Sequence, residues 1–266
     1  MADLKRISKS EVKYVRSLAQ KKFRDNERKF LVEGWKLLND ALESGFRLEF
    51  VAVTNDAAGE PGQRSFLENI RALHIDLKVM TEVELKQMSG TVHAQGVIGL
   101  AQQMMHSLED VLAKAARLIV LADRVSDPGN LGTMIRTCDW FRADAMILSE
   151  GCADLYNDKV VRSTAGSVFH VPVVEHANIA ETVRKVKSKG FRVFATSGTA
   201  RKSYQDAEYA EKNLLIFGNE ATGSAQEVLR MGDDVIAIPK GGRAESLNVA
   251  VACGIVLAHV TTSFKQ

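Results

Sequence analysis

The last quarter of the chain contains the sequence IAIPKGGRAESLNVAVACGIVLAH, which runs from Ile236 to His259. A short β-branched run ends at Pro239, and the glycine pair that follows predicts a turn. Ser246 stands where a helix N-cap is expected, ahead of ten apolar or small residues at 249–258. This run is too short to span a bilayer, and it has no polar face. It therefore predicts a helix that is covered on more than one side.

Strand and helix patterns alternate through residues 110–266 and lead up to this stretch. The candidate strands are continuous and β-branched, as buried parallel strands are, and helical patterns separate most of them. The alternation predicts an α/β domain whose parallel sheet has helices on both faces. The expected strands lie at 118–121, 145–148, 171–174, 191–195, 214–217 and 235–238, and the helices before the terminal one lie at 131–141, 179–189 and 225–231.

Residues 1–101 predict a second, smaller α/β domain, joined to the first by a polar linker at 102–109. Its apolar patterns are short and are separated by glycine, proline and charged turns. We expect a basic turn at 21–24 and a loop at 55–62. The expected strands lie at 30–33, 50–53, 76–80 and 97–101, and the expected helices at 10–19, 35–43, 66–73 and 82–88.

Composition is that of an ordinary globular protein, with 45% apolar and 26% charged residues. The cysteines are Cys138, Cys152 and Cys253, an odd number without close spacing, which argues against disulfides and a zinc site. The first residues are charged, and no apolar run follows them, so we expect no signal peptide. These features predict a cytoplasmic protein with no metal and no membrane segment.

Positive charge is concentrated at the start of the chain. Residues 1–36 hold eleven Lys and Arg against five acids, a net charge of +6, whereas the whole chain carries +2 and the remainder therefore −4. A basic arm on a mildly acidic body indicates a polyanionic partner. An amphipathic helix with a solvated charged face explains the same pattern, and charge alone does not decide between the two.

Three loops follow predicted parallel strands, at the edge where such sheets bind ligands. The first contains Asn130, which is expected to cap a helix that carries Arg136. The second runs from Gly218 to Gly223, and the third is the loop that precedes the terminal helix. The dinucleotide fingerprint GxGxxG and the Walker A motif are both missing, so a nicotinamide, flavin or nucleotide-hydrolysing enzyme of the usual kind is not expected.

Together the three loops resemble, in order, the three motifs of the SpoU/TrmH family of RNA ribose 2′-O-methyltransferases. The motifs read NLGTMIR at 130–136, FGNEATG at 217–223 and IPKGGRAESLNV at 238–249. The resemblance implies a SPOUT fold with a C-terminal trefoil knot, the methyl donor S-adenosylmethionine, and a homodimer formed by the C-terminal domain. The segment HAQGVIGL at 93–100 resembles the end of the family's N-terminal RNA-binding domain, which is similar to a ribosomal protein of the L30 type.

The resemblance also implies the residues of the site. The expected catalytic residues are Asn130, Arg136, Glu220, Ser246 and Asn248. The expected cofactor-binding residues are Thr196, Ser197, Gly198, Ile216, Gly218, Asn219, Glu220, Gly223, Ile238, Pro239, Gly241 and Leu247. For RNA, either tRNA or ribosomal RNA, the expected contacts are Lys21, Lys22, Arg24, Arg162 and Ser163. Two residues depart from the family pattern: Lys240 replaces an apolar residue, and Arg142 replaces a glycine.

The chemistry is an in-line transfer in which the ribose 2′-oxygen attacks a methyl carbon on a sulfonium. Arg136 is the family's catalytic group, sometimes assigned as a base. Because a guanidinium stays protonated, we expect it instead to hold a phosphate and stabilise the developing alkoxide. Two alternatives stay open: a non-catalytic RNA-binding protein on the same fold, and a methyltransferase of the same superfamily that modifies a base.

Overall fold

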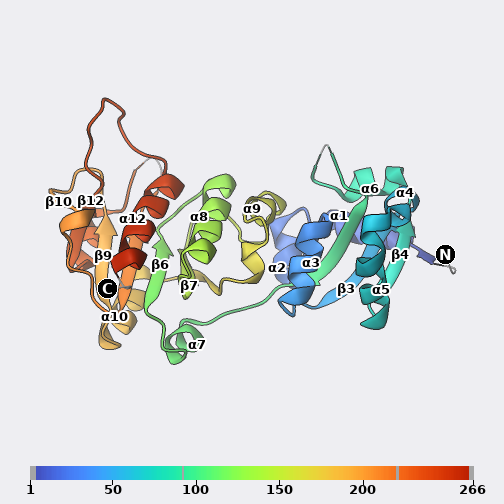
Figure 1. Cartoon of the computed structure of the whole chain (residues 1–266), viewed down its shortest axis with the longest axis horizontal. Coiled ribbons are helices and arrows are strands. Elements are labelled where there is room, and N and C mark those ends of the chain that lie inside the picture. The colour runs from blue at the N-terminus through green and yellow to red at the C-terminus, as the bar shows by residue number, and fades with distance from the viewer. Residues whose placement is uncertain (1–3, 92, 220–221, 264–266) are drawn as a thin grey trace. The chain divides into compact units, whose positions relative to one another are not determined.

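The computed structural model describes residues 4–91, 93–219 and 222–263, and it divides into two compact units. One contains the chain up to Met104 together with Tyr156–Phe169; the other contains Met105–Leu155 and the chain from His170 onward. Each unit has its own sheet, and Figure 1 labels many of the elements. The units differ from the predicted domains mainly at Tyr156–Phe169, an internal segment that packs with the N-terminal unit.

The first unit is built on a five-stranded sheet in the order β1-β4-β3-β5-β2. β5 runs antiparallel to β3 and β2, whereas β1 and β3 run parallel to β4. This confirms the smaller α/β domain. The strands are β1 (Lys5–Arg6), β2 (Lys29–Glu33), β3 (Leu48–Thr54), β4 (Asp76–Met80) and β5 (Val97–Gln102). The helices are α1 (Lys9–Ser17), α2 (Lys21–Glu27), α3 (Trp35–Glu43), α4 (Asn55–Gly59), η1 (Pro61–Gln63), α5 (Arg64–Ala72), α6 (Glu82–Met88), α9 (Asp158–Ser163) and η2 (Ser167–Phe169).

Two segments that we expected to be irregular are helical. The expected basic turn at 21–24 is the start of α2, and the expected loop at 55–62 forms α4 and the short 3₁₀ helix η1. Thr54 caps α4, since its hydroxyl accepts the N–H of Ala57 at 3.4 Å. Helices of one or two turns have too few residues to show an apolar period, which explains why the sequence pattern missed them.

Aromatic side chains hold Tyr156–Phe169 in the first unit. The Phe30 ring of β2 is fully buried and lies 4.4 Å from the Tyr156 ring, centroid to centroid. Phe169 packs edge-on against Phe46 at 4.9 Å. The Tyr156 hydroxyl also donates to the carbonyl of Met104 at 2.8 Å. Burial of aromatic rings stabilises strongly, so these contacts outweigh the position of the segment in the sequence.

The second unit has a seven-stranded sheet in the order β10-β12-β9-β11-β6-β7-β8, and every pair is parallel. All six predicted strands are present, and the parallel α/β fold is confirmed. The strands are β6 (Leu118–Ala122), β7 (Ala145–Ser149), β8 (Val173–Ala177), β9 (Arg192–Thr196), β10 (Lys202–Ser203), β11 (Asn213–Phe217) and β12 (Asp234–Ala237). β10 was not predicted, and β8 begins two residues later than expected.

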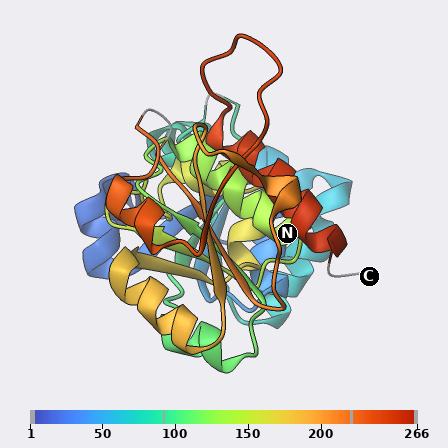
Figure 2. The ribbon, with the colours of Figure 1, turned by 90° about the vertical axis from the view of Figure 1, so that its left-hand side faces the viewer.

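Helices cover both faces of this sheet. α7 (Leu108–Ala113), α10 (Ile179–Ser188) and α11 (Gln226–Met231) pack on one face over a core that alternate strand residues supply. α8 (Pro128–Trp140) and α12 (Val249–Ser263) pack against each other on the other face, as Figure 2 shows. In the described chain no helix has the length and apolar character needed to cross a membrane. The trefoil knot stays a prediction.

The backbone conformation of Arg142 accounts for the glycine that the family usually has at this position. Arg142 follows α8 with φ of 55°, a left-handed conformation that glycine adopts at least cost. The usual glycine at this position therefore suits a helix end, and an arginine here changes the cost of the turn rather than its path.

Candidate active site

The loops that carry the predicted cofactor-binding and catalytic residues leave four neighbouring strands at the same edge of the sheet. In the sheet order β12-β9-β11-β6, all four strands are parallel, so their carboxyl ends lie together. The helix α8 follows β6, and the loop before α12 follows β12. The sheet therefore brings the three sequence motifs to one edge, where ligands of open α/β sheets bind.

The start of α8 differs from our expectation. The helix begins at Pro128, and its cap is Asp127, whose carboxylate accepts the N–H of Asn130 at 2.8 Å. The prediction that Asn130 caps the helix is therefore wrong. A proline is favoured at the first helical position, which moves the start back by three residues, from Leu131 to Pro128. Asn130 lies in the first turn, and its side chain is left to contact another part of the site.

The cap of α12 also differs. Ser246 was expected to cap this helix, but the helix begins at Val249, and Asn248 is the cap. The side-chain oxygen of Asn248 accepts the N–H groups of Ala250 at 2.9 Å and Val251 at 3.2 Å. Ser246 lies two residues earlier in a loop that is exposed throughout 239–248. Ser246 and Asn248 both have side-chain oxygens that can cap a helix, and only the path of the backbone decides between them.

Asn248 joins the first and third motifs. Its amide nitrogen donates to the side-chain oxygen of Asn130 at 2.7 Å. The two backbone N–H groups occupy the oxygen of Asn248, and this fixes which end of the amide faces Asn130. Further along, a Cβ built on Gly254 would lie 3.8 Å from the Thr137 methyl group. α8 and α12 thus run side by side in the same direction, so two predicted catalytic residues are in direct contact.

Arg136 lies on the exposed side of α8. It forms no hydrogen bond or ion pair with any residue in the described part of the chain. Its neighbours Thr133 and Thr137 instead bond back to helix carbonyls, Gly129 and Thr133, at 2.8 Å each. A guanidinium in this position keeps all five donors available to a bound anion.

The second motif forms a closed turn after β11. Gly223 has φ of +65°, and its N–H donates to the carbonyl of Asn219 at 2.9 Å. A Cβ on Gly218 would meet the Ser224 nitrogen at 2.1 Å, so only glycine fits there. The backbone therefore requires glycine at both positions. Glu220, predicted to be both catalytic and cofactor-binding, lies outside the described residues.

The other predicted cofactor residues lie along the same edge. The Thr196 hydroxyl donates to the carbonyl of Ile216 at 2.9 Å, and the Ser197 N–H donates to the carbonyl of Ile236 at 3.0 Å. Ile216 itself is buried, so it offers only its backbone. A Cβ on Gly198 or Gly241 would meet nothing within 4 Å. Ile238 is half-buried, whereas Pro239, Gly241 and Leu247 are exposed.

The predicted RNA contacts are corrected at Arg24. This side chain is 4% exposed, and its guanidinium donates to the carbonyls of Leu18 at 2.6 Å and Ala19 at 2.8 Å. It therefore satisfies carbonyls at the end of α1 and is not a surface cation. Lys21 and Lys22 are exposed.

Arg162 and Ser163 lie on α9 in the first unit. Arg162 pairs with Asp158 at 2.8 Å, and the Ser163 hydroxyl donates to the carbonyl of Lys159 at 2.7 Å. A Cβ on Gly90 would lie 2.1 Å from the Asp158 carboxylate, which shows how closely α9 approaches the loop after α6. The arginine is thus partly neutralised before any RNA arrives.

Two buried thiols line the contact of α8 and α12. Cys138 and Cys253 are both fully buried and reduced. A hydrogen bond with the Cys138 thiol and burial both raise the pKa of the Cys253 thiol well above its ordinary value. The Cys253 thiol therefore stays protonated and unreactive. Both buried cysteines act as small apolar groups in the packing.

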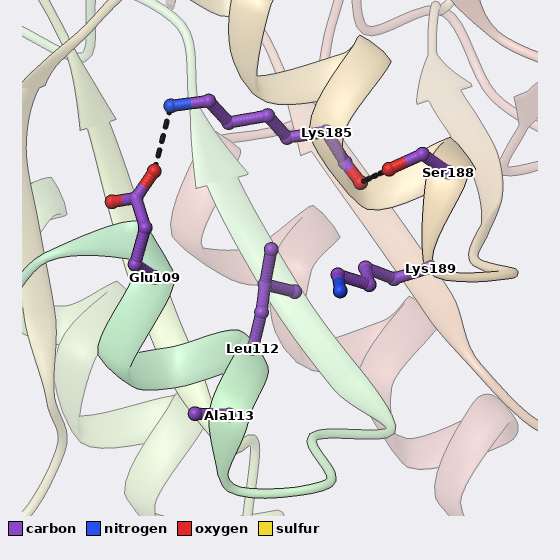
Figure 3. A pocket seen from close by; sticks show the side chains of 6 residues that line it. All are labelled: Glu109, Leu112, Ala113, Lys185, Ser188 and Lys189. Atoms are coloured by element: carbon purple, nitrogen blue, oxygen red, sulfur yellow. Dashed lines mark hydrogen bonds and ion pairs between the residues drawn. The ribbon is translucent and has the colours of Figure 1, made fainter.

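A separate pocket lies at the opposite edge of the sheet (Figure 3). α7 and α10 line it, near the ends that lead into the amino termini of β6 and β9. Lys185 crosses it to Glu109 at 2.7 Å. None of the predicted site residues line it; its residues are Glu109, Leu112, Ala113, Lys185, Ser188 and Lys189. Over the described ranges no group of three or more His, Cys, Asp or Glu is placed to hold a metal ion.

Comparison with known proteins agrees with a parallel α/β fold that carries the three motifs at one edge. The model of the SpoU rRNA Methylase family matches residues 117–258, and that of the MRM3-like substrate binding domain matches residues 9–99. The chain belongs to the SpoU rRNA methylase family.

Named relatives span almost the whole chain. The 23S rRNA (guanosine(2553)-2′-O)-methyltransferase RlmP of Bacillus subtilis (strain 168) is 34% identical over 260 residues, or 98% of this chain and 99% of that one. RlmB of Vibrio vulnificus, a 23S rRNA (guanosine-2′-O-)-methyltransferase, is 31% identical over 72% of this chain and 79% of its own. The crystal structure of an AdoMet-bound rRNA methyltransferase from Sinorhizobium meliloti gives a TM-score of 0.87 at 31% identity, covering 98% and 97% of the two chains.

Sequence reasoning missed three residues at the same edge. Asp123, Arg124 and Ser149 follow or end the strands β6 and β7, and they connect the loops there. An acid directly after a buried strand, followed by an arginine, was the available signal.

Proposed function

We infer that this protein transfers the methyl group of S-adenosylmethionine to a ribose 2′-hydroxyl of RNA. The observation that carries this inference is the Asn248–Asn130 hydrogen bond, which joins two of the family's motifs beside an uncommitted Arg136. Membership of the SpoU rRNA methylase family agrees with it. The intact set of motif residues disfavours a binding protein without activity, and the ribose-specific names of the relatives disfavour base methylation.

The chain's loops fit the cofactor. Gly198 and Gly241 face open space, so their backbone is accessible to a ligand, whereas Gly218 and Gly223 serve the turn that Asn219 closes. We propose that these loops, with Thr196, Ser197, Ile216, Ile238, Pro239 and Leu247, hold the adenosine and methionine parts. When bound, S-adenosylmethionine supplies the methyl group on a positively charged sulfur.

Arg136 is proposed as a phosphate clamp. Its guanidinium is planar and two-pronged, a geometry that matches a phosphate and that lysine lacks. It would orient the ribose so that the 2′-oxygen forms the new bond to the methyl carbon while the carbon–sulfur bond breaks; the sulfur keeps that bond's electron pair, and the hydroxyl proton passes to water. It also stabilises the negative charge that develops on that oxygen. Asn130, Ser246, Asn248 and Glu220 are proposed to position the ribose and the arginine.

The activity is tested with purified protein, tritiated S-adenosylmethionine and ribosomal RNA that lacks modifications. We expect label in a ribose 2′-O-methyl group. Arg117→Ala is a matched control for Arg136→Ala, because Arg117 is an exposed arginine at the amino end of β6, with its partner Glu211 at 2.9 Å. Labelled base, or no label with any RNA while the donor binds normally, would overturn the proposal.

The first unit is proposed to select the RNA. Lys9, Lys13 and Arg16 fall at helical spacing on one exposed face of α1, next to the face that buries Val12 and Val15. Such a row, with Lys21 and Lys22 of α2, presents cations to a phosphate backbone. The names of the RlmP and RlmB relatives favour 23S ribosomal RNA as the substrate.

Charge reversal tests this surface. We expect Lys9→Glu with Lys13→Glu and Arg16→Glu to weaken RNA binding and to flatten its salt dependence, because fewer counterions are released. Lys189→Glu, an exposed change on the second unit, is the control. Unchanged affinity and salt slope in the triple variant would show that RNA binds elsewhere.

We propose that the protein forms a homodimer through the second unit and works in the cytoplasm. α12 is apolar around its circumference, yet Val251 is 51% exposed, and Trp140 at the end of α8 is 82% exposed. Apolar surface of this kind favours a second copy as its cover. Val251→Asp should lower the mass measured by light scattering to that of a monomer, whereas the equivalent change at exposed Val83 of α6 should not. Three free cysteines fit a reducing compartment.

We also propose that substrate selection and methyl transfer divide between 1–101 and 110–266, with 102–109 as linker. The family matches at 9–99 and 117–258 support that division. Because Tyr156–Phe169 packs in the first unit, it should be retained in any separated N-terminal fragment.

A further inference from the structure

Arg124 has an unusual backbone conformation next to the candidate active site. It lies two residues after β6 with φ of 56°, in the left-handed region where residues with a Cβ are disfavoured. It does not end a helix, where this conformation is common. A residue held in such a conformation requires contacts that fix it, and these often serve function.

A buried carboxylate holds the side chain. Arg124 Nε donates to Asp123 Oδ1 at 2.9 Å, and Nη2 donates to Oδ2 at 3.4 Å. The Asp123 side chain is only 2% exposed, whereas that of Arg124 is 45% exposed. A carboxylate that is removed from water needs a partner, so Asp123 binds Arg124 firmly.

The backbone of Arg124 connects three loops. Its N–H donates to the Ser149 hydroxyl at the end of β7 at 2.9 Å. Its carbonyl accepts the amide nitrogen of Asn219, in the second motif, at 2.8 Å. The side-chain oxygen of Asn219 in turn accepts the N–H of Thr222 at 3.1 Å, inside the closed turn. One strained residue thus links the loops after β6, β7 and β11.

We propose that Arg124 is a positioning residue that sets the second-motif turn through Asn219 and thereby controls affinity for S-adenosylmethionine. This rests on the proposed function. The ion pair with Asp123 keeps the carbonyl of Arg124 aimed at Asn219, and Asn219 orients the turn that is proposed to contact the cofactor. Arg124 touches neither reactant in this role.

Four variants test the route: Arg124→Ala, Arg124→Gly, Arg124→Lys and Asn219→Ala. Arg124→Gly relieves the backbone strain and removes the ion pair, so it separates the two effects. We expect calorimetry to show about a tenfold weaker affinity for S-adenosylmethionine in the alanine and glycine variants, the size expected for one lost hydrogen bond. Lysine keeps a charge for Asp123 and should recover part of the affinity.

The double variant Arg124→Ala with Asn219→Ala gives the sharpest result. If Arg124 acts through Asn219, the double variant binds no more weakly than Asn219→Ala alone. Arg117→Ala, which lies at the other end of β6, is the control and should bind normally. Thermal unfolding identifies any variant that fails to fold, and in that case Arg124→Lys and Asn219→Ala still decide the question.

Three outcomes overturn the proposal. One is an Arg124→Ala affinity equal to that of Arg117→Ala, and another is additive losses in the double variant. The third is weaker RNA binding with normal cofactor binding, which would make Arg124 an RNA contact. Failure of the unmodified protein to bind S-adenosylmethionine would instead contradict the proposed function, so the two failures are distinguishable.

Discussion

Replacing Asn248 with alanine removes two sets of contacts at once. The side-chain oxygen caps α12 through the N–H groups of Ala250 and Val251, and the amide nitrogen donates to Asn130. Loss of an asparagine cap costs about 1 kcal/mol, and net loss of a neutral hydrogen bond costs about 1 kcal/mol. We therefore expect Asn248→Ala to lower the free energy of unfolding by about 2 kcal/mol, or roughly 4–8 °C in Tm.

Asn248→Asp separates the two roles. A carboxylate still accepts the two N–H groups, and negative charge is favourable at a helix N-terminus, so the cap survives. The donor to Asn130 is lost unless the Asn130 amide turns over. Asn248→Asp should therefore unfold near the temperature of the unmodified protein and still transfer methyl groups poorly. Asn130→Ala should lose about 1 kcal/mol for its hydrogen bond with Asn248.

The assay pairs scanning calorimetry with methyl transfer from the tritiated donor. A double-mutant cycle over Asn130 and Asn248 should give a coupling of about 1 kcal/mol. An Asn248→Ala variant that melts within about 1 °C of the unmodified protein would refute the assigned contacts. So would strict additivity in the cycle, because two groups in direct contact must couple.

Three further outcomes follow from the site and the first unit. Arg136→Lys should fold and bind the methyl donor but lose most turnover in the same assay, because lysine keeps the charge without the two-pronged geometry; near-normal turnover would leave only a charge role. Arg24→Ala should lower Tm with little change in RNA affinity measured by filter binding, because Arg24 holds α1 carbonyls; a pure loss of RNA affinity would contradict its burial. Burial raises the pKa of the Glu11 carboxyl, but hydrogen bonds with Lys78 and Ser8 outweigh this effect. The net result is that the pKa falls from 4.5 to about 2. Since the folded pKa lies below the unfolded one, the ionised Glu11 carboxylate stabilises the folded protein by at most about 3 kcal/mol. This contribution is complete above pH 4.5 and is lost as pH falls toward 2. The difference in Tm between the unmodified protein and Glu11→Gln should shrink over that window, and a constant difference would exclude ionisation as its cause.

Local sequence patterns were sufficient for most of the elements. Continuous β-branched runs predicted six strands of the parallel sheet, and the apolar run after Asn248 predicted α12. These features depend on residues close together in the chain, so one sequence reveals them. The ordered motifs identified the family, because each places several residue types at defined spacing.

The errors share one physical cause. The chemistry of Ser246 and Asn248 fits a cap equally well, and the same is true of Asp127 and Asn130; the backbone path chose Asn248 and Asp127. Arg24 is a residue type that is usually a surface cation, but its guanidinium is buried and donates to a carbonyl at the end of α1. In each case the role of the side chain depends on which backbone N–H or C=O groups lack a hydrogen-bond partner nearby. These unpaired groups are defined only when the chain is folded and packed.

The sequence by itself determined the class of fold, the family and the residues that we propose for the site. Only the tertiary structure decided that Asn130 and Asn248 meet, that Tyr156–Phe169 joins the first unit, and that Arg124 connects three loops. Secondary-structure propensity and motif spacing depend on residues that are close together in the sequence. Strand order, burial and contacts between loops result instead from the packing of elements that are far apart in it. The former can be read from one sequence, and the latter require the folded molecule.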